Sequence, residues 1–181
     1  MAFLNPSVVV EKFDLRAGMR IADFGCGSGH FTIEMARLIG RDGVVYALDV
    51  QSEALEAVKS RAALARLSNI EIGRADLEAQ NSTGLKDNLV DFVLVSNMLF
   101  QVENKEAVAR ECFRILKPGA RAAVIDWLPG SFQERLGPPQ SARIPKEQAV
   151  QLFEAAGLKK ARDINVGESH YGLIFIKSPE H

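Results

Sequence analysis

The 181-residue chain has few of the features that mark specialised classes of protein. Its two cysteines, Cys26 and Cys112, are too few for a disulfide scaffold and too far apart for a CxxC metal clip. Lys and Arg together number 22 and Asp and Glu 23, so the chain lacks the basic excess typical of nucleic-acid-binding proteins. We therefore expect neither a metal site nor a nucleic-acid partner.

Long apolar runs are also missing: none approaches the roughly 20 residues that a membrane-spanning helix needs. The first residues, Met1–Pro6, lack the charged-then-apolar order of a signal peptide. These absences and the two distant cysteines predict a cytoplasmic protein without a membrane span. The length fits one domain, so we expect a single domain over residues 1–181 with no separate domain that caps a substrate.

Short apolar, β-branched runs alternate with longer stretches of helical periodicity. The alternation predicts a mostly parallel sheet with helices on both faces, and the short connection 167–170 makes the last strand antiparallel. Residues 117–119 should end a helix, and residues 128–144 should form a loop. The predicted strands are residues 19–24, 44–49, 69–73, 89–96, 120–127, 158–166 and 171–177, and the predicted helices are 30–39, 52–67, 105–116 and 146–156.

A glycine-rich segment, residues 23–29 (Asp-Phe-Gly-Cys-Gly-Ser-Gly), lies between the first predicted strand and the first predicted helix. Alternate glycines let the main chain turn sharply and let a ligand approach it, and the helix behind offers free N–H groups. A dinucleotide-binding loop of the Gly-x-Gly-x-x-Gly type would place a glycine where this chain has His30. Asp49 ends the second strand and can accept hydrogen bonds from both hydroxyls of a ribose.

With these residues the chain resembles the class I S-adenosylmethionine-dependent methyltransferases. Three further blocks extend the resemblance over almost the whole chain: Ala75–Leu77, Val90–Asn97 and Arg114–Gly119. The order of the blocks is similar to that of the small-molecule group near the ubiquinone/menaquinone C-methyltransferases. The resemblance implies a Rossmann-like, seven-stranded α/β sheet. It also implies S-adenosyl-L-methionine as cofactor and S-adenosyl-L-homocysteine as its product.

The resemblance also implies which residues bind the cofactor. In the family the glycine loop cradles the methionine part, and the acidic residue after the second strand binds the ribose. An acidic residue after the third strand, here Asp76, often contacts the adenine amino group. The implied cofactor-binding residues are Asp23, Phe24, Gly25, Cys26, Gly27, Gly29, Asp49, Val50, Gln51, Ala75, Asp76, Leu77, Ser96 and Asn97.

The sequence defines the acceptor side less well. Many relatives carry a histidine after the fourth strand, where this chain has Phe100 and Gln101, and Ala120 replaces a common glycine. His170 in the final hairpin is a candidate base, as is Asp126, which can instead cap a loop. The candidate substrate contacts are Phe100, Gln101, Trp127, Arg143, His170 and Tyr171.

The predicted function is methyl transfer to a small-molecule acceptor by in-line displacement. A sulfonium methyl group is already electrophilic, so positioning supplies much of the rate, and a base is needed only where the nucleophile must lose a proton. Three alternatives stay open: a methyltransferase that acts on RNA or protein through an open site, a non-catalytic cofactor-binding module, and a nicotinamide-dependent oxidoreductase. His30 and the lack of a Tyr-x-x-x-Lys pair disfavour the oxidoreductase. A monomer and a homodimer are both consistent with the sequence.

Overall fold

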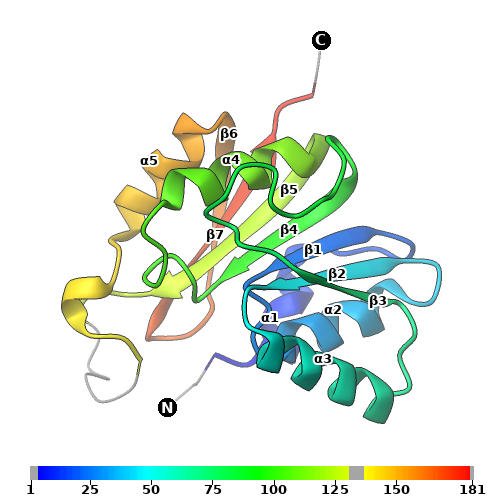
Figure 1. Ribbon diagram of the computed structural model, residues 1–181. Coiled ribbons are helices and arrows are strands. Elements are labelled where there is room, and N and C mark those ends of the chain that lie inside the picture. The colour runs from blue at the N-terminus through cyan, green and yellow to red at the C-terminus, as the bar shows by residue number, and fades with distance from the viewer. Residues whose placement is uncertain (1–3, 131–136, 180–181) are drawn as a thin grey trace.

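A computed structural model describes residues 4–130 and 137–179 of the chain (Figure 1). The helices are α1 (Pro6–Val10), η1 (Glu11–Phe13), α2 (His30–Ile39), α3 (Ser52–Leu64), α4 (Lys105–Ile115), η2 (Gln140–Ala142) and α5 (Lys146–Ala155). The strands are β1 (Arg20–Phe24), β2 (Val44–Asp49), β3 (Ile70–Arg74), β4 (Val90–Ser96), β5 (Leu116–Trp127), β6 (Leu158–Ile164) and β7 (His170–Lys177).

The seven strands form one sheet in the order β3-β2-β1-β4-β5-β7-β6. Neighbours among β1 to β5 pair in parallel, whereas β7 lies between β5 and β6 and is antiparallel to both. The predicted fold class is therefore confirmed. Because β7 runs back along β5, His170 at its start lies opposite Trp127 at the end of β5.

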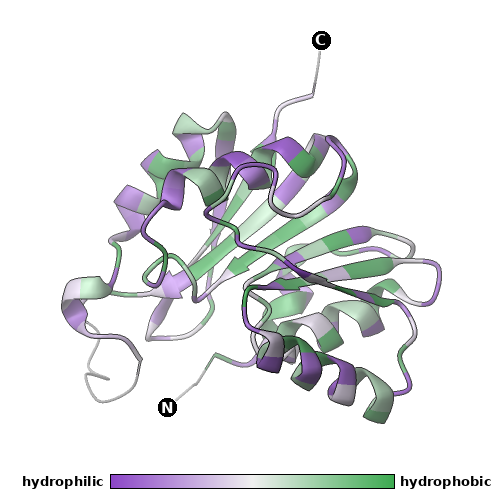
Figure 2. Ribbon diagram, in the orientation of Figure 1, coloured by the Kyte–Doolittle hydropathy of each residue, from purple (hydrophilic) through white to green (hydrophobic). Residues whose placement is uncertain are grey.

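Helices cover both faces of this sheet (Figure 1). On one face, α4 and α5 contribute Cys112 and Phe153 to a packed core. On the other face, Phe13 and Met35 pack in one cluster and Val58 of α3 in another. Figure 2 shows that the strands are mainly hydrophobic and the helices mixed, as expected when both sheet faces are buried.

Local chemistry explains where several helices begin and end. The glycines that flank α2, Gly29 and Gly40, have φ of 83° and 69°, a region in which residues with a Cβ are strained. α4 begins after Asn104, whose side chain accepts a hydrogen bond from the N–H of Ala107 at 3.2 Å. α3 ends at Leu64, earlier than predicted, and Arg66 just beyond it adopts a left-handed φ of 54°.

Three segments differ from the sequence-based expectation or extend it. Residues 117–119 follow the end of α4 as predicted, but they form a bulge within β5 instead of a turn, with Gly119 at φ 78°. The predicted loop 128–144 contains the short helix η2, and its residues 131–136 lie outside the described part of the chain. The short helices α1 and η1 had no counterpart among the predicted elements.

The strand order creates a crevice at one edge of the sheet. From β1 the chain continues outward to β2 and β3, then returns and places β4 on the other side of β1. Ligands of open α/β sheets bind outside the carboxyl ends of the strands at such a reversal. Within the described residues, no helix is long and apolar enough to cross a membrane, and no His, Cys, Asp and Glu side chains group as a metal site.

Candidate functional site

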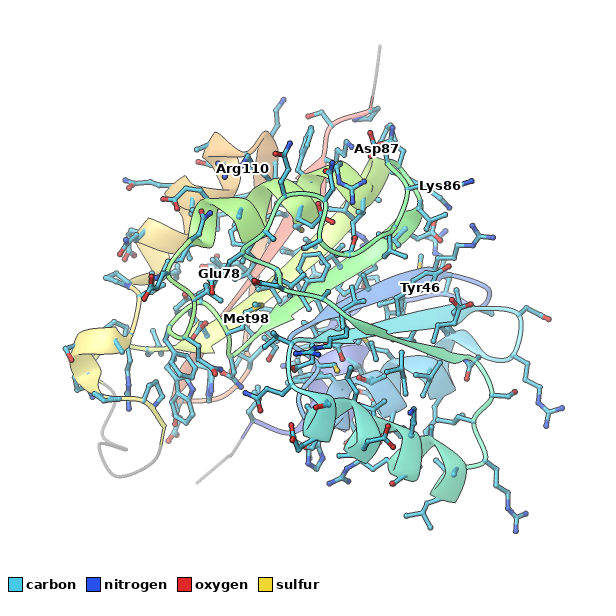
Figure 3. The ribbon with its side chains drawn as sticks, in the orientation of Figure 1. Tyr46, Glu78, Lys86, Asp87, Met98 and Arg110 are labelled. Atoms are coloured by element: carbon cyan, nitrogen blue, oxygen red, sulfur yellow. The ribbon has the colours of Figure 1, made fainter. Side chains whose placement is uncertain are left out.

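A hollow of about 990 Å³ opens at the carboxyl ends of the strands, at the upper end of the roughly 300–1,000 Å³ range of small-molecule pockets. Figure 3 shows two of its residues, Glu78 after β3 and Met98 after β4. The predicted site residues that line the hollow are Asp23, Gly25, Cys26, Gly27, Asp49, Val50, Gln51, Ala75, Asp76, Leu77, Ser96, Asn97, Gln101 and Trp127.

The glycine loop forms one wall of the hollow. Gly25, Gly27 and Gly29 have φ of 65°, 51° and 83°, so each occupies the left-handed region that favours glycine. A Cβ at Gly29 would lie 2.9 Å from Val58 Cγ2, so this glycine lets α3 pack closely against the loop. A Cβ at Gly27 would meet no atom within 4 Å. The main chain at Gly27 is therefore open to a ligand in the hollow.

Asp49 ties the glycine loop to the end of β2. Its Oδ2 accepts a hydrogen bond from the N–H of Gly27 at 2.9 Å, and its Oδ1 accepts one from the N–H of Gln51 at 3.0 Å. A carboxylate offers about four acceptor positions. Asp49 can thus hold the loop in place and still accept hydrogen bonds from a ligand.

Asp23 lies at the base of the loop and is almost fully buried. Burial raises the pKa of this carboxyl to about 7, against the lowering effect of a 2.5 Å hydrogen bond donated by Thr32 Oγ1. The nearby charge of Asp49 raises the pKa further. A positive charge on a ligand beside Asp23 would favour the ionised form of its carboxyl group and lower its pKa.

The segment after β3 forms a second wall and is anchored to α4. Asp76 Oδ1 accepts a hydrogen bond from the N–H of Glu78 at 3.1 Å. Glu78 Oε1 in turn accepts from the N–H groups of Glu103 and Asn104, both at 2.7 Å, next to the start of α4. Asp76 is therefore presented to the hollow by a loop that is fixed at both ends.

Two buried polar atoms at the end of β4 have no hydrogen-bond partner: Ser96 Oγ and Asn97 Oδ1. Both residues line the hollow. Since more than nine in ten buried polar groups in proteins are paired, these two atoms mark a place where polar groups of a ligand fit.

Beyond Asn97 the lining is apolar apart from Gln101. Met98, Val102 and Trp127, here called the apolar wall, lie there, and Leu4 and Pro6 line the hollow from the N-terminal segment. All ionisable side chains among the described lining residues come instead from the ends of β1 and β2 and from the segments after β1 and β3: Asp23, Cys26, His30, Asp49, Asp76 and Glu78. The hollow thus has a polar side and an apolar side.

The indole ring of Trp127 contacts the imidazole of His170 and the guanidinium of Arg143. The ring of His170 lies 4.1 Å from the indole ring, centroid to centroid, and Arg143 Cζ lies 5.2 Å from the indole centroid. Arg143 is buried and donates hydrogen bonds to the carbonyl groups of Leu128 and Pro138 at 3.0 and 3.1 Å. Burial, and then the charge of Arg143, lower the pKa of His170 to about 4, so the imidazole is neutral at pH 7.

Asp126 and Tyr171 lie side by side in the pairing of β5 with β7 and do not line the hollow. Asp126 is fully buried and accepts hydrogen bonds from the N–H groups of Leu99 at 3.0 Å and Trp127 at 2.8 Å. Burial raises its pKa to about 6, and burial also raises the pKa of the unpartnered Tyr171 hydroxyl. Of the two roles predicted for Asp126, the geometry favours the loop cap.

Five further predicted site residues lie outside the lining of the hollow. Phe24 is fully buried beneath the loop, Gly29 is the N-cap residue just before α2, and Phe100, Arg143 and His170 are set back from the hollow. The hollow also includes residues that the sequence did not indicate. Met98 directly follows the predicted Asn97 and Glu78 lies two residues after Asp76, so a wider window around each motif would have included them. Leu4 and Pro6 line the hollow because the N-terminal segment packs against it, and no local motif predicts this packing.

A second hollow, of about 610 Å³, lies between residues 78–81 and α4. Its buried acid, Glu111, is paired with Arg114 at 2.7 Å and accepts a 2.6 Å hydrogen bond from the Thr83 hydroxyl. No residue of the glycine loop lines this hollow, so the crevice beside β1 is the candidate site.

Comparison with known proteins agrees with this geometry. A family model described as a methyltransferase domain matches residues 15–157, which is more than half of the chain. The chain belongs to the class I S-adenosylmethionine-dependent methyltransferases, a family of enzymes that depend on S-adenosylmethionine.

Individual proteins that are similar to this chain are named methyltransferases. The ubiquinone/menaquinone biosynthesis C-methyltransferase UbiE of Cronobacter sakazakii is 30% identical over 125 residues, which are 68% of this chain and 49% of that protein. The same-named protein of Pasteurella multocida is 32% identical over 119 residues, 65% of this chain and 43% of that protein. The chain thus spans about half the length of these curated relatives. A crystal structure of a SAM-dependent methyltransferase from Aquifex aeolicus superposes with a TM-score of 0.86 at 27% identity, over 96% of this chain and 90% of that one.

Proposed function

We propose that the chain binds S-adenosyl-L-methionine at the glycine loop and transfers the methyl group to a small-molecule acceptor held against the apolar wall. The observation that carries this proposal is the single hollow that joins the glycine loop to Met98, Val102 and Trp127. Because the relatives at about 30% identity are named C-methyltransferases, we further propose that carbon is the methylated atom.

The residues present fit the cofactor. The open main chain at Gly27 gives room for the methionine part, and Asp49 keeps free acceptor positions for the ribose hydroxyls. The unpartnered Ser96 Oγ and Asn97 Oδ1 supply further polar contacts at the same hollow. Asp76 would contact the adenine amino group from the loop after β3.

When bound, S-adenosylmethionine supplies an electrophilic methyl carbon. The chain itself contributes mainly position: the glycine loop and Asp49 orient one reactant, and the apolar wall holds the other and excludes water. Among the described residues the apolar wall carries no ionisable group, and His170 behind Trp127 is a weak base because its pKa is lowered to about 4. We therefore expect acceptors that ionise in solution or react as neutral nucleophiles.

The proposal is tested by incubating the purified chain with S-adenosylmethionine and a panel of acceptors, with S-adenosylhomocysteine measured by mass spectrometry. The panel holds phenols, enolisable 1,3-dicarbonyl compounds and thiols of graded pKa, together with bulk RNA and a protein mixture. We expect turnover of at least one small acceptor, at a rate that rises with pH as that acceptor ionises. Methylation of RNA or protein alone, or tight cofactor binding without any turnover, would overturn the proposal.

A further inference from the structure

Asp126 joins the loop after β4 to the end of β5, and both border the acceptor side of the hollow. Its Oδ2 accepts a hydrogen bond from the N–H of Leu99, in the loop after β4, and its Oδ1 accepts one from the N–H of Trp127, at the end of β5. The main chain of Met98 also lowers the pKa of this carboxyl group. One buried side chain thus holds the main chain next to two members of the apolar wall.

We propose that Asp126 is a positioning residue, whose carboxylate fixes Met98 and Trp127 relative to each other and thereby sets where the acceptor lies against the cofactor. This inference rests on the proposed function. Asp126 acts through the apolar wall and not as a base, because its oxygens are engaged by main-chain N–H groups and it does not line the hollow.

The hydrogen bonds from the N–H groups of Leu99 and Trp127 to Asp126, here called the clamp, also influence the cofactor side of the hollow. A Cβ at Gly25 would lie 3.4 Å from both Cβ and Sδ of Met98, so Met98 packs directly on the glycine loop. Movement of the loop after β4 would therefore change the contact between the apolar wall and the glycine loop.

The surroundings of Asp126 are sparsely charged. Lys105 at the start of α4 faces it and favours its ionised form, while its ammonium donates a 2.5 Å hydrogen bond to the carbonyl of Val102. Tyr171 of β7 is its register partner, and Glu147 of α5 acts on the same phenol. Burial dominates, so the pKa of Asp126 is raised to about 6.

This pKa makes the clamp testable without a known acceptor. A protonated carboxyl gains a donor and loses acceptor capacity, so part of the clamp is released as the pH falls through about 6. Because the pKa is raised above that of the unfolded chain, protonation of Asp126 favours the folded state, and the change is local. Trp127 is the only tryptophan in the chain, so its fluorescence reports on the clamped segment.

The experiment is a pH titration of Trp127 fluorescence between pH 8 and 4.5, with circular dichroism to show that the chain stays folded. The background variant carries His30→Gln and His170→Gln, because His30 lines the hollow and His170, whose pKa is about 4, lies against Trp127. We expect a transition near pH 6 that persists in Asp23→Asn and disappears in Asp126→Asn. Absence of the transition in the background, or its survival in Asp126→Asn, would overturn the inference.

Two further measurements separate this inference from the proposed function and from a purely structural role. Calorimetric titration with S-adenosylhomocysteine should give a dissociation constant for Asp126→Asn within about threefold of wild type. With an acceptor from the panel, kcat should fall at least tenfold. If the background chain shows the pH 6 transition but the wild-type chain does not bind S-adenosylhomocysteine, the proposed function fails while the clamp stands. If Asp126→Asn does not fold, the decision rests on Lys105→Met, which removes the ammonium that favours the ionised carboxylate and should shift the transition to higher pH; an unshifted midpoint would contradict the clamp.

Discussion

The two sides of the hollow are built in different ways. On the side of β1, β2 and β3, main-chain N–H groups, left-handed glycines and Asp49 form the surface. The glycines lie within one short loop, and Asp49 reaches Gly27 from the end of β2, 22 residues away. On the side of β4, β5 and β7, Trp127 depends on His170 and Arg143, which reach it from other segments. The first side follows a recognisable sequence pattern, a glycine-rich loop and an acidic strand end, whereas the second has no such pattern. Substitutions should therefore separate cofactor binding from acceptor handling.

The largest expected effect is at Gly27. In Gly27→Val a branched side chain would occupy a position with φ 51° and stand in the hollow, so we expect the affinity for S-adenosylhomocysteine to fall more than about 100-fold. Calorimetric titration measures the loss. Gly119→Val is the matched control, since Gly119 also has a left-handed φ and an open surrounding but lies in the β5 bulge. Equal losses in both variants would attribute the effect to backbone strain and not to the hollow.

Asp23→Asn should change how stability depends on pH. The carboxyl has a pKa of about 7 when folded and an ordinary value of 3.8, so the folded state holds a proton that the unfolded chain has lost between about pH 4 and 7. Stability is therefore lost as the pH rises through this window, by about 2–4 kcal/mol at about 1.36 kcal/mol per pKa unit. Urea unfolding at pH 5 and pH 8 should show this loss in wild type and a smaller one in Asp23→Asn. The same pH slope in both proteins would show that Asp23 is not the group concerned.

Asp49→Ala should weaken cofactor binding by roughly 1–3 kcal/mol, through loss of hydrogen bonds to the ribose and of the support for Gly27. The fluorescence of Trp127 should stay unchanged, because Asp49 belongs to the other side of the hollow. Titration calorimetry and emission spectra on one sample check both statements. Unchanged affinity in the folded variant would remove the ribose assignment.

Trp127→Leu should have the smallest effect on the cofactor and act on the acceptor. We expect the S-adenosylhomocysteine dissociation constant to stay within about threefold of the wild-type value. The acceptor KM should rise about 5- to 30-fold, equivalent to about 1–2 kcal/mol of binding free energy, because an aromatic contact is lost. Tyr46→Leu is the control: Tyr46 is a half-buried aromatic residue on β2 that does not line the hollow (Figure 3). A larger loss of cofactor affinity than of acceptor affinity in Trp127→Leu would contradict the division into two sides.

The same division explains what the sequence could predict. The fold class and the positions of Asp23 and Asp49 at strand ends follow from local patterns, because periodicity and glycine spacing act over a few residues, whereas the place of Asp76 came from the family resemblance. The antiparallel direction of the last strand was predicted because the connection 167–170 is too short for a parallel crossover. The bulge at residues 117–119 could not be distinguished from a turn, since both require a breaker and only pairing with β4 decides between them.

The acceptor side was predicted less completely for a physical reason. His170 was predicted only as a candidate base in the final hairpin. Its contact with Trp127, its burial and the nearby Arg143 depend on how β5, β7 and residues 138–144 pack. Nothing in the sequence around Asp126 and Trp127 indicates that the Asp126 carboxylate also accepts a hydrogen bond from the N–H of Leu99. Such contacts over long sequence separations have no local signature.

The most direct test of the central claim is calorimetric titration of the purified chain with S-adenosylmethionine, S-adenosylhomocysteine and NAD(H), after removal of any co-purified ligand. We predict binding of both sulfur nucleosides and none of NAD(H), because the Gly-x-Gly-x-Gly loop, Asp49 and the unpartnered Ser96 and Asn97 atoms form one cradle. Binding of NAD(H) alone, or of no nucleoside at all, would contradict the assignment of the hollow.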